Sequence, residues 1–195
     1  ASDVYKRQDY TLLDAEINAF NLLNSPTAFA LAATTTVTLD DQSEVTAFIS
    51  DVKSDPALLV VSGASQAVTV TNSGAGGVDI TVAEANDITA NTGGTVTATV
   101  SDGDLDTLAG TGGGDGLAAR ANAALTVTVT DTAGTAAELN TVNAGTTVAV
   151  DASAVTTIES STAADISTLM TAAQNVAQFS ACLLYTSPSP RDGLL

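Results

Sequence analysis

The chain has 195 residues, of which 22 are acidic and five are basic, with one cysteine and neither histidine nor tryptophan. Its formal net charge of −17 disfavours nucleic acids and anionic membranes as partners, because their phosphates would be repelled. The lack of histidine nearly excludes the usual general bases and zinc sites. The longest apolar runs, such as residues 57–61, are too short to cross a membrane, so no membrane insertion is expected.

The two ends differ in composition from the middle of the chain. Residues 1–8 and 182–195 contain three of the five basic residues and the single cysteine, Cys182. Both stretches resemble translated transposon-type sequencing adapters, which predicts that they are adapter-derived tails and not native. Residues 9–181 then hold 20 acidic and two basic residues, a formal charge of −18, and no cysteine. We expect residues 9–181 to be an internal piece of a longer reading frame.

Two kinds of short segment alternate along the chain. Period-2 runs of β-branched residues predict strands at 37–39, 68–70, 78–82, 96–100, 125–129 and 148–150. A second recurring motif begins with Ser, Thr or Asp. An acidic residue follows three positions after that first residue, and apolar residues follow four and seven positions after it. This is a capping box followed by one apolar helix face, so it predicts a short helix. In chain order the motif begins, irregularly, at Thr11 and then at Asp41, Thr81, Ser101, Thr135 and Thr162.

The repeated order of strand, turn and short helix predicts the architecture. The five regular caps lie 40, 20, 34 and 27 residues apart, in the range of solenoid repeats. The longest gap has room for an extra strand pair around residues 72–77, and residues 110–116 are typical of a glycine-rich loop. Such short helices need a neighbour to persist. The predicted fold is an α/β solenoid of parallel strands backed by short helices, with right-handed crossovers. The alternative is a pair of all-β sandwich modules.

Four aspartates follow predicted strands and are the candidate site residues: Asp40, Asp102, Asp131 and Asp151. If the strands stack in register, these carboxylates form a column with neighbours about 5 Å apart, and their repulsion must be offset. One interpretation is that each carboxylate accepts backbone N–H groups in a turn or helix cap. The other is a row of calcium ions that bridge carboxylates of adjacent repeats. Both interpretations remain open at this point.

Other motifs are weak. Residues 102–106 fail the EF-hand pattern, because Thr107 stands where the loop requires glycine. Residues 110–115 miss the calcium nonapeptide by one glycine and occur once. The many acidic residues are compatible with a glycosidase that uses a pair of carboxylates, but the aromatic residues against which sugars stack are scarce. No catalytic residue is therefore predicted.

Residues 135–146, Thr-Ala-Ala-Glu-Leu-Asn-Thr-Val-Asn-Ala-Gly-Thr, are similar to a phrase found in phage tail-fibre-like and large bacterial surface-protein repeats. Residues 150–158 and 162–166 resemble repeats of long, acidic, Thr/Ala/Asp-rich bacterial cell-surface proteins. The resemblance implies a non-enzymatic, extracellular spacer or adhesive array. Its expected partners are neighbouring repeats of the same chain and cell-surface or matrix polymers, with calcium as a possible cofactor. A phage tail-fibre segment and a polysaccharide-acting β-helix enzyme are the alternatives.

Overall fold

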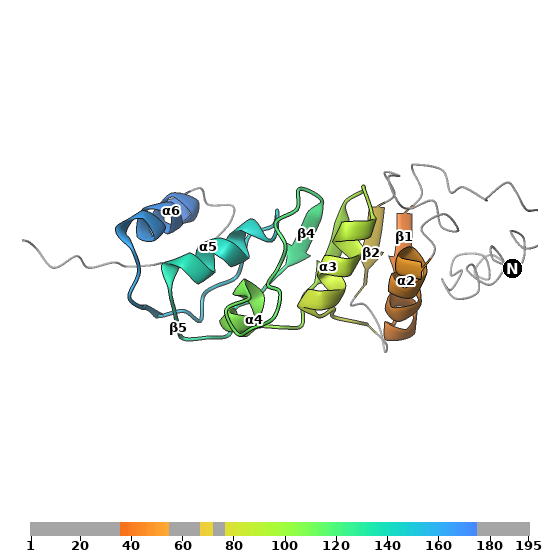
Figure 1. Ribbon diagram of the computed structural model, residues 1–195, viewed down its shortest axis with the longest axis horizontal. Helices are drawn as coiled ribbons and strands as arrows, with labels where there is room; N and C mark the ends of the chain where they lie inside the picture. Colours follow the sequence, from red (N-terminus) through yellow and green to blue (C-terminus); the bar gives the residue numbers. More distant parts are fainter. Residues whose placement is uncertain (1–35, 55–66, 72–76, 175–195) are drawn as a thin grey trace, which may run out of the picture.

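A computed structural model of the chain describes residues 36–54, 67–71 and 77–174 (Figure 1). The two predicted adapter tails, the helix expected after Thr11 and most of the strand pair expected at residues 72–77 lie outside the described residues.

The described residues form a mixed α/β structure on a four-stranded parallel sheet, in which the strands lie side by side in chain order. The strands are β1 (Thr36–Leu39), β2 (Ala67–Val70), β3 (Val96–Thr99) and β4 (Ala123–Thr126). Two further short strands, β5 (Ala133–Gly134) and β6 (Thr157–Ile158), pair in parallel in a sheet of their own. The parallel α/β prediction is thus confirmed. The sandwich alternative is wrong for the described residues, because every strand pair there is parallel and a helix lies between consecutive strands of the four-stranded sheet.

Five short helices accompany the strands in the described part of the chain. They are α2 (Gln42–Ser54), α3 (Val82–Asn91), α4 (Leu105–Ala109), α5 (Ala136–Ala144) and α6 (Ala163–Gln174). The helix α2 packs against α3, α4 against α5, and α5 against α6. The elements follow one another along the long axis of the molecule (Figure 1). Helices of five to 13 residues are marginal alone in water, so their neighbours must stabilise them.

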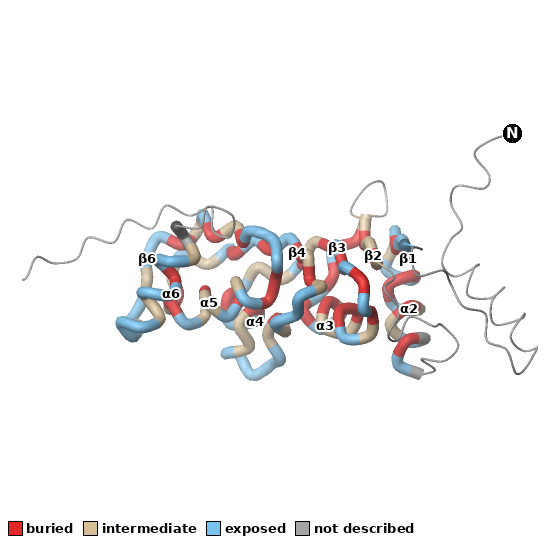
Figure 2. The backbone as a smooth tube through the Cα atoms, turned by 90° about the horizontal axis from the view of Figure 1, so that it is seen from above, coloured by how far each residue is buried: buried red, intermediate tan, exposed pale blue. Residues whose placement is uncertain are grey.

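The core lies between the sheet and the helices. Alternation along the strands turns residues such as Leu39, Val68 and Leu125 inward, where they are fully or almost fully buried. Phe48 and Ile88 meet them from α2 and α3 and have no exposed surface. Figure 2 shows β1–β4 on one side of the tube and α2–α4 on the other. Each such side chain contributes about 1.5–3 kcal/mol through burial.

Four of the five regular helix starts are confirmed: those at Asp41, Thr81, Thr135 and Thr162. The prediction at Ser101 is wrong, since α4 begins four residues later with Asp104 as its cap. The Ser101 amide donates to the Ile80 carbonyl at 2.9 Å, and its hydroxyl also contacts that oxygen. Ser101 therefore still belongs to the sheet.

Three strand predictions are also incorrect in extent. The strand expected at 125–129 is β4, which spans Ala123–Thr126. Residues 78–82 make only an isolated bridge from Ile80 to Val100, and Val82 already begins α3. Residues 148–150 form no strand, although Asp151 makes a parallel bridge to Thr128. The edge of β4 is instead met by Thr146, whose buried hydroxyl contacts both the amide and the carbonyl of Leu125.

Candidate functional site

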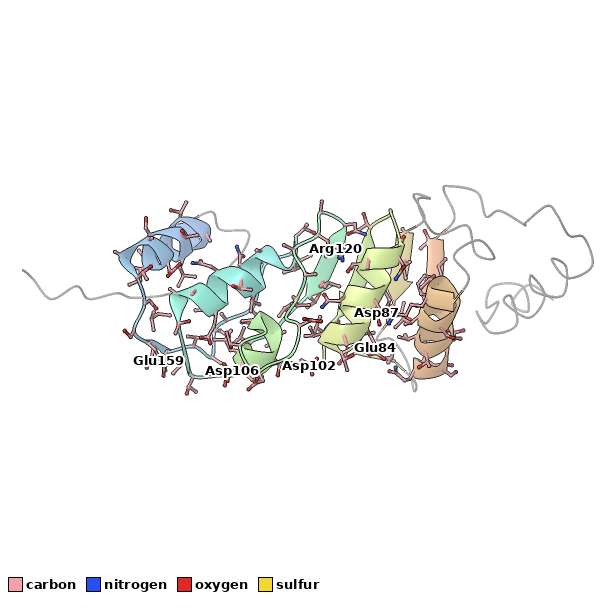
Figure 3. All side chains as sticks on the ribbon, viewed as in Figure 1. Glu84, Asp87, Asp102, Asp106, Arg120 and Glu159 are labelled. Atoms are coloured by element: carbon pink, nitrogen blue, oxygen red, sulfur yellow. The ribbon has the colours of Figure 1, made fainter. Side chains whose placement is uncertain are left out.

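Acidic side chains gather where the strands end and the helices begin. Parallel strands place all their carboxyl ends on the same edge of a sheet, and the following helices start there. Figure 3 shows the labelled residues Glu84, Asp102, Asp106 and Glu159 along this edge. We call it the acidic edge, and it is the candidate functional site.

Within each unit of strand and helix, a local cap uses part of this charge. In α3 the Glu84 amide donates to the Thr81 hydroxyl at 3.3 Å, and the Glu84 carboxylate accepts the Thr81 amide at 2.9 Å. In α5 Thr135 and Glu138 form the same box at 3.2 and 2.9 Å. A negative charge in the first turn also interacts favourably with the helix dipole. The predicted capping boxes at these two positions are therefore confirmed.

A second cap joins three of the helices, α3, α4 and α5, to residues of the next unit along the chain. The first amide of α3, on Val82, donates to the Asp102 carboxylate at 2.8 Å, across 20 residues. The first amide of α4, on Leu105, donates to Asp131 at 2.6 Å, across 26 residues. In α5 the first amide donates to the Ser161 hydroxyl at 2.9 Å. We call these three contacts the cross-unit caps. They supply an acceptor to helix amides that have no partner within their own helix.

Asparagines tie the same units together away from the acidic edge. The Asn86 side chain of α3 donates to the Gly116 carbonyl and accepts the Ala118 amide, both at 2.9 Å. At the other end of α3, the Asn122 amide group contacts the carbonyls of Thr89, Thr92 and Gly94. The start, middle and end of α3 are thus each fixed by residues that follow it in the chain.

The four predicted site residues have separate environments. Asp102 and Asp131 are the carboxylates of two cross-unit caps. Asp151 accepts the Ser153 amide at 3.0 Å, which is an Asx turn. Asp40 is exposed and lies beside Asp41 and Glu44. For Asp102, Asp131 and Asp151 the structure agrees with the interpretation that strand-end carboxylates accept backbone N–H groups.

The group Asp40, Asp41 and Glu44 could hold a metal ion, because one carboxylate oxygen from each lies within 4.8 Å of the others. Calcium prefers such oxygen ligands. Their oxygens also serve the start of α2: Asp41 accepts the Glu44 amide at 2.9 Å, and Glu44 accepts the Asp40 amide at 2.7 Å. The Ser43 hydroxyl and the Glu44 amide donate to Asp41 and hold its pKa below the ordinary value. Of these three residues only Asp40 was predicted as a site residue, although the pair Asp40 and Asp41 precedes Glu44 by about one helical turn in the sequence.

A pocket of about 230 Å³ opens on the acidic edge between α4 and α5. Its carboxylates are Asp104, Asp106, Asp131, Glu138 and Glu159. The Thr135 amide donates to Glu138 and holds the pKa of Glu138 below its ordinary value, although partial burial opposes this shift. The hydroxyls of Thr135 and Thr111 add to the same effect. The chain thus favours the ionised form of Glu138 even among other carboxylates.

Basic residues neutralise little of this charge. Lys53 pairs with Asp87 at 2.6 Å, and about half of the lysine side chain is exposed. An exposed pair of this kind stabilises a protein by at most about 1 kcal/mol. Among the described residues, Arg120 makes no salt bridge, and Figure 3 places it away from the acidic edge.

No helix among the described residues has both the length and the apolar character needed to span a membrane. Comparisons of the chain with protein-family models, with curated proteins and with solved structures find no match.

Proposed function

We propose that the chain is a non-enzymatic structural or adhesive repeat segment of a large secreted or surface-attached bacterial protein. In this proposal the strand–helix units continue as a solenoid, and neighbouring units of the same chain are the principal partners. Cell-surface or matrix polymers are the external partners, and the location is extracellular.

The cross-unit caps are the observation that carries the proposal. The caps Asp41, Thr81, Asp104, Thr135 and Thr162 follow one another at 40, 23, 31 and 27 residues. Each of α3, α4 and α5 receives a side chain from further along the chain. Each of these helices is therefore stabilised by the unit that follows it. In a stacked repeat array, stability comes in the same way from the interfaces between neighbouring repeats. Such an array suits a spacer that must remain extended.

Mechanical unfolding of the full chain tests this function directly. Stretching between the two ends should give rupture events, and each should release one or more units of 23 to 40 residues. One unit corresponds to about 80–140 Å of extended chain. Extension without any rupture event would refute a structural role. Adhesion is measured separately as retention of labelled protein on bacterial surface and matrix polysaccharides.

A polysaccharide-acting enzyme is the second candidate, because the pocket on the acidic edge gathers five carboxylates. Glycoside hydrolysis requires one carboxyl group to stay protonated and to act as an acid. The lowered pKa of Glu138 suits the ionised partner of such a pair and not the acid. The scarcity of aromatic residues, at 4% of the chain, is what favours the structural function. The test is to incubate the chain with acidic and neutral polysaccharides. Release of reducing ends would favour the enzyme over the structural function. The tail-fibre alternative is separated by light scattering, since it requires a trimer whereas the surface segment is expected to be monomeric.

A further inference from the structure

The side of the sheet that faces away from the helices carries a regular array of threonines. Alternation along each strand sends Val, Leu or Ala inward and Thr outward. The outward residues include Thr36 and Thr38 on β1, Thr69 on β2, Thr97 and Thr99 on β3, and Thr126 on β4. We call these six residues the threonine face, and each of them is exposed or half-exposed.

The strand register aligns the threonines in rows. Thr38 lies beside Thr69, and Thr69 lies beside Thr97. The same row continues to Ala124 on β4, and a second row pairs Thr99 with Thr126. Neighbours in a row are therefore about 4.8 Å apart, and successive threonines on one strand are about 6.6 Å apart. The β-branched side chain restricts χ1, so hydroxyl and methyl groups are held in a repeating two-dimensional pattern.

The hydroxyl groups of the threonine face remain free for an external partner. None of the six hydroxyl groups makes a hydrogen bond to a described residue, whereas the backbone groups of these threonines take part in the sheet. Threonines on the helices behave differently: Thr46, Thr141 and Thr168 each donate to the carbonyl four residues earlier, at 2.8, 2.9 and 3.1 Å. The sheet therefore presents hydroxyl groups outward, whereas the helices use theirs internally.

Charge argues for an uncharged partner. The six threonines are uncharged, although the whole chain carries a net charge of −17, and the nearest acid in the register is Asp79, which precedes the Ile80–Val100 bridge and so aligns with Thr99 at the rim of this face. The labelled acids Glu84, Asp102, Asp106 and Glu159 lie along the acidic edge (Figure 3). A cationic polymer would favour that edge, and a polyanion would be repelled by the molecule as a whole. A neutral partner with its own two-dimensional repeat matches this face best.

We propose that the threonine face binds ice. The surface of hexagonal ice is neutral and carries a two-dimensional lattice of oxygen atoms, and the threonine face offers hydroxyl and methyl groups on a repeat of about 4.8 by 6.6 Å. The hydroxyl groups would join the ordered water layer, and the methyl groups would occupy the spaces between its oxygens. This ligand goes beyond the structural role proposed above, because the face would bind ice whether or not the chain bears load.

Uptake of the labelled full chain into a slowly growing ice hemisphere tests the proposal, with serum albumin as the excluded reference. Wild type should enter the ice, and Thr69→Lys and Thr97→Lys should lose this uptake. Thr141→Lys, on α5, is the matched control and should retain it. Circular dichroism establishes that all variants are folded.

Several outcomes would overturn the proposal. One is exclusion of the wild type from ice to the same extent as albumin. Another is equal uptake of Thr97→Lys and wild type. If wild type binds crystalline cellulose or chitin but not ice, the partner is a polysaccharide lattice. If wild type is a dimer that Thr97→Lys converts to a monomer, the partner is a second copy. A negative result on ice leaves the stretching experiment unaffected, so the two proposals fail separately.

Discussion

Removal of the Asp131 carboxylate should destabilise the protein because it opens a cross-unit cap. Asp131 is half-buried and accepts the first amide of α4, on Leu105, at 2.6 Å. The helix α4 has only five residues, so this contact is a large part of what holds its start. In Asp131→Ala the Leu105 amide loses its hydrogen-bond partner. Leu105 is only 3% exposed, so water cannot easily replace the carboxylate.

The expected cost follows from two opposing contributions. A hydrogen bond to a charged acceptor stabilises by about 1.5–3 kcal/mol, and loss of a helix cap costs about 1 kcal/mol. The same substitution relieves repulsion between Asp131 and the other carboxylates of the pocket, and partial exposure weakens both contributions. We therefore expect Asp131→Ala to lower the free energy of unfolding by about 1–2 kcal/mol. The melting temperature should fall by about 2–8 °C.

Urea denaturation, thermal melting and amide hydrogen exchange measure these effects. Asp131→Asn keeps an oxygen acceptor and should lose less stability than Asp131→Ala. Asp115→Ala removes an exposed carboxylate from the glycine-rich loop and is the matched control. Exchange at the Leu105 amide should accelerate in Asp131→Ala and not in Asp115→Ala. The reasoning is refuted if the two alanine variants melt together, or if the Leu105 amide stays equally protected in both.

Four further predictions concern single sites. Gly134→Ala should destabilise by about 1–3 kcal/mol in urea, since its new Cβ would clash with the Leu105 side chain; unchanged stability would contradict this packing. Thr146→Val should cost about 1–3 kcal/mol, because the Leu125 amide and carbonyl lose their hydrogen bonds to the hydroxyl. Thr126→Val is the control, because Thr126 is exposed and its hydroxyl makes no hydrogen bond to a described residue. The lowered pKa of Glu138 stabilises the fold at pH values above its ordinary pKa of 4.5, and this contribution is lost as the pH falls through the lower pKa of the folded state. The stability difference between wild type and Glu138→Gln should therefore disappear in acid, and a pH-independent difference would refute the assignment. Millimolar calcium should raise the melting temperature of wild type but not of Asp40→Asn/Glu44→Gln, and identical shifts would discard that metal site.

The sequence alone determined the features that depend on neighbours within a few residues. The strands β1, β2 and β3 follow from alternation, because each buries one face under the helices. The capping boxes at Thr81 and Thr135 are visible for the same reason, since their donors and acceptors are three residues apart. Local hydrogen bonds of this kind need no knowledge of the fold.

Only the tertiary structure decided which residues serve a neighbouring unit. Asp102 and Asp131 look like any strand-end aspartate, yet they cap helices that begin 20 and 26 residues earlier. Ser101 has the sequence of a helix start, but the Ile80 carbonyl takes its amide, and Asp104 becomes the cap. Partners so far apart in sequence meet only after the sheet has brought consecutive units into register, so no local pattern can specify them.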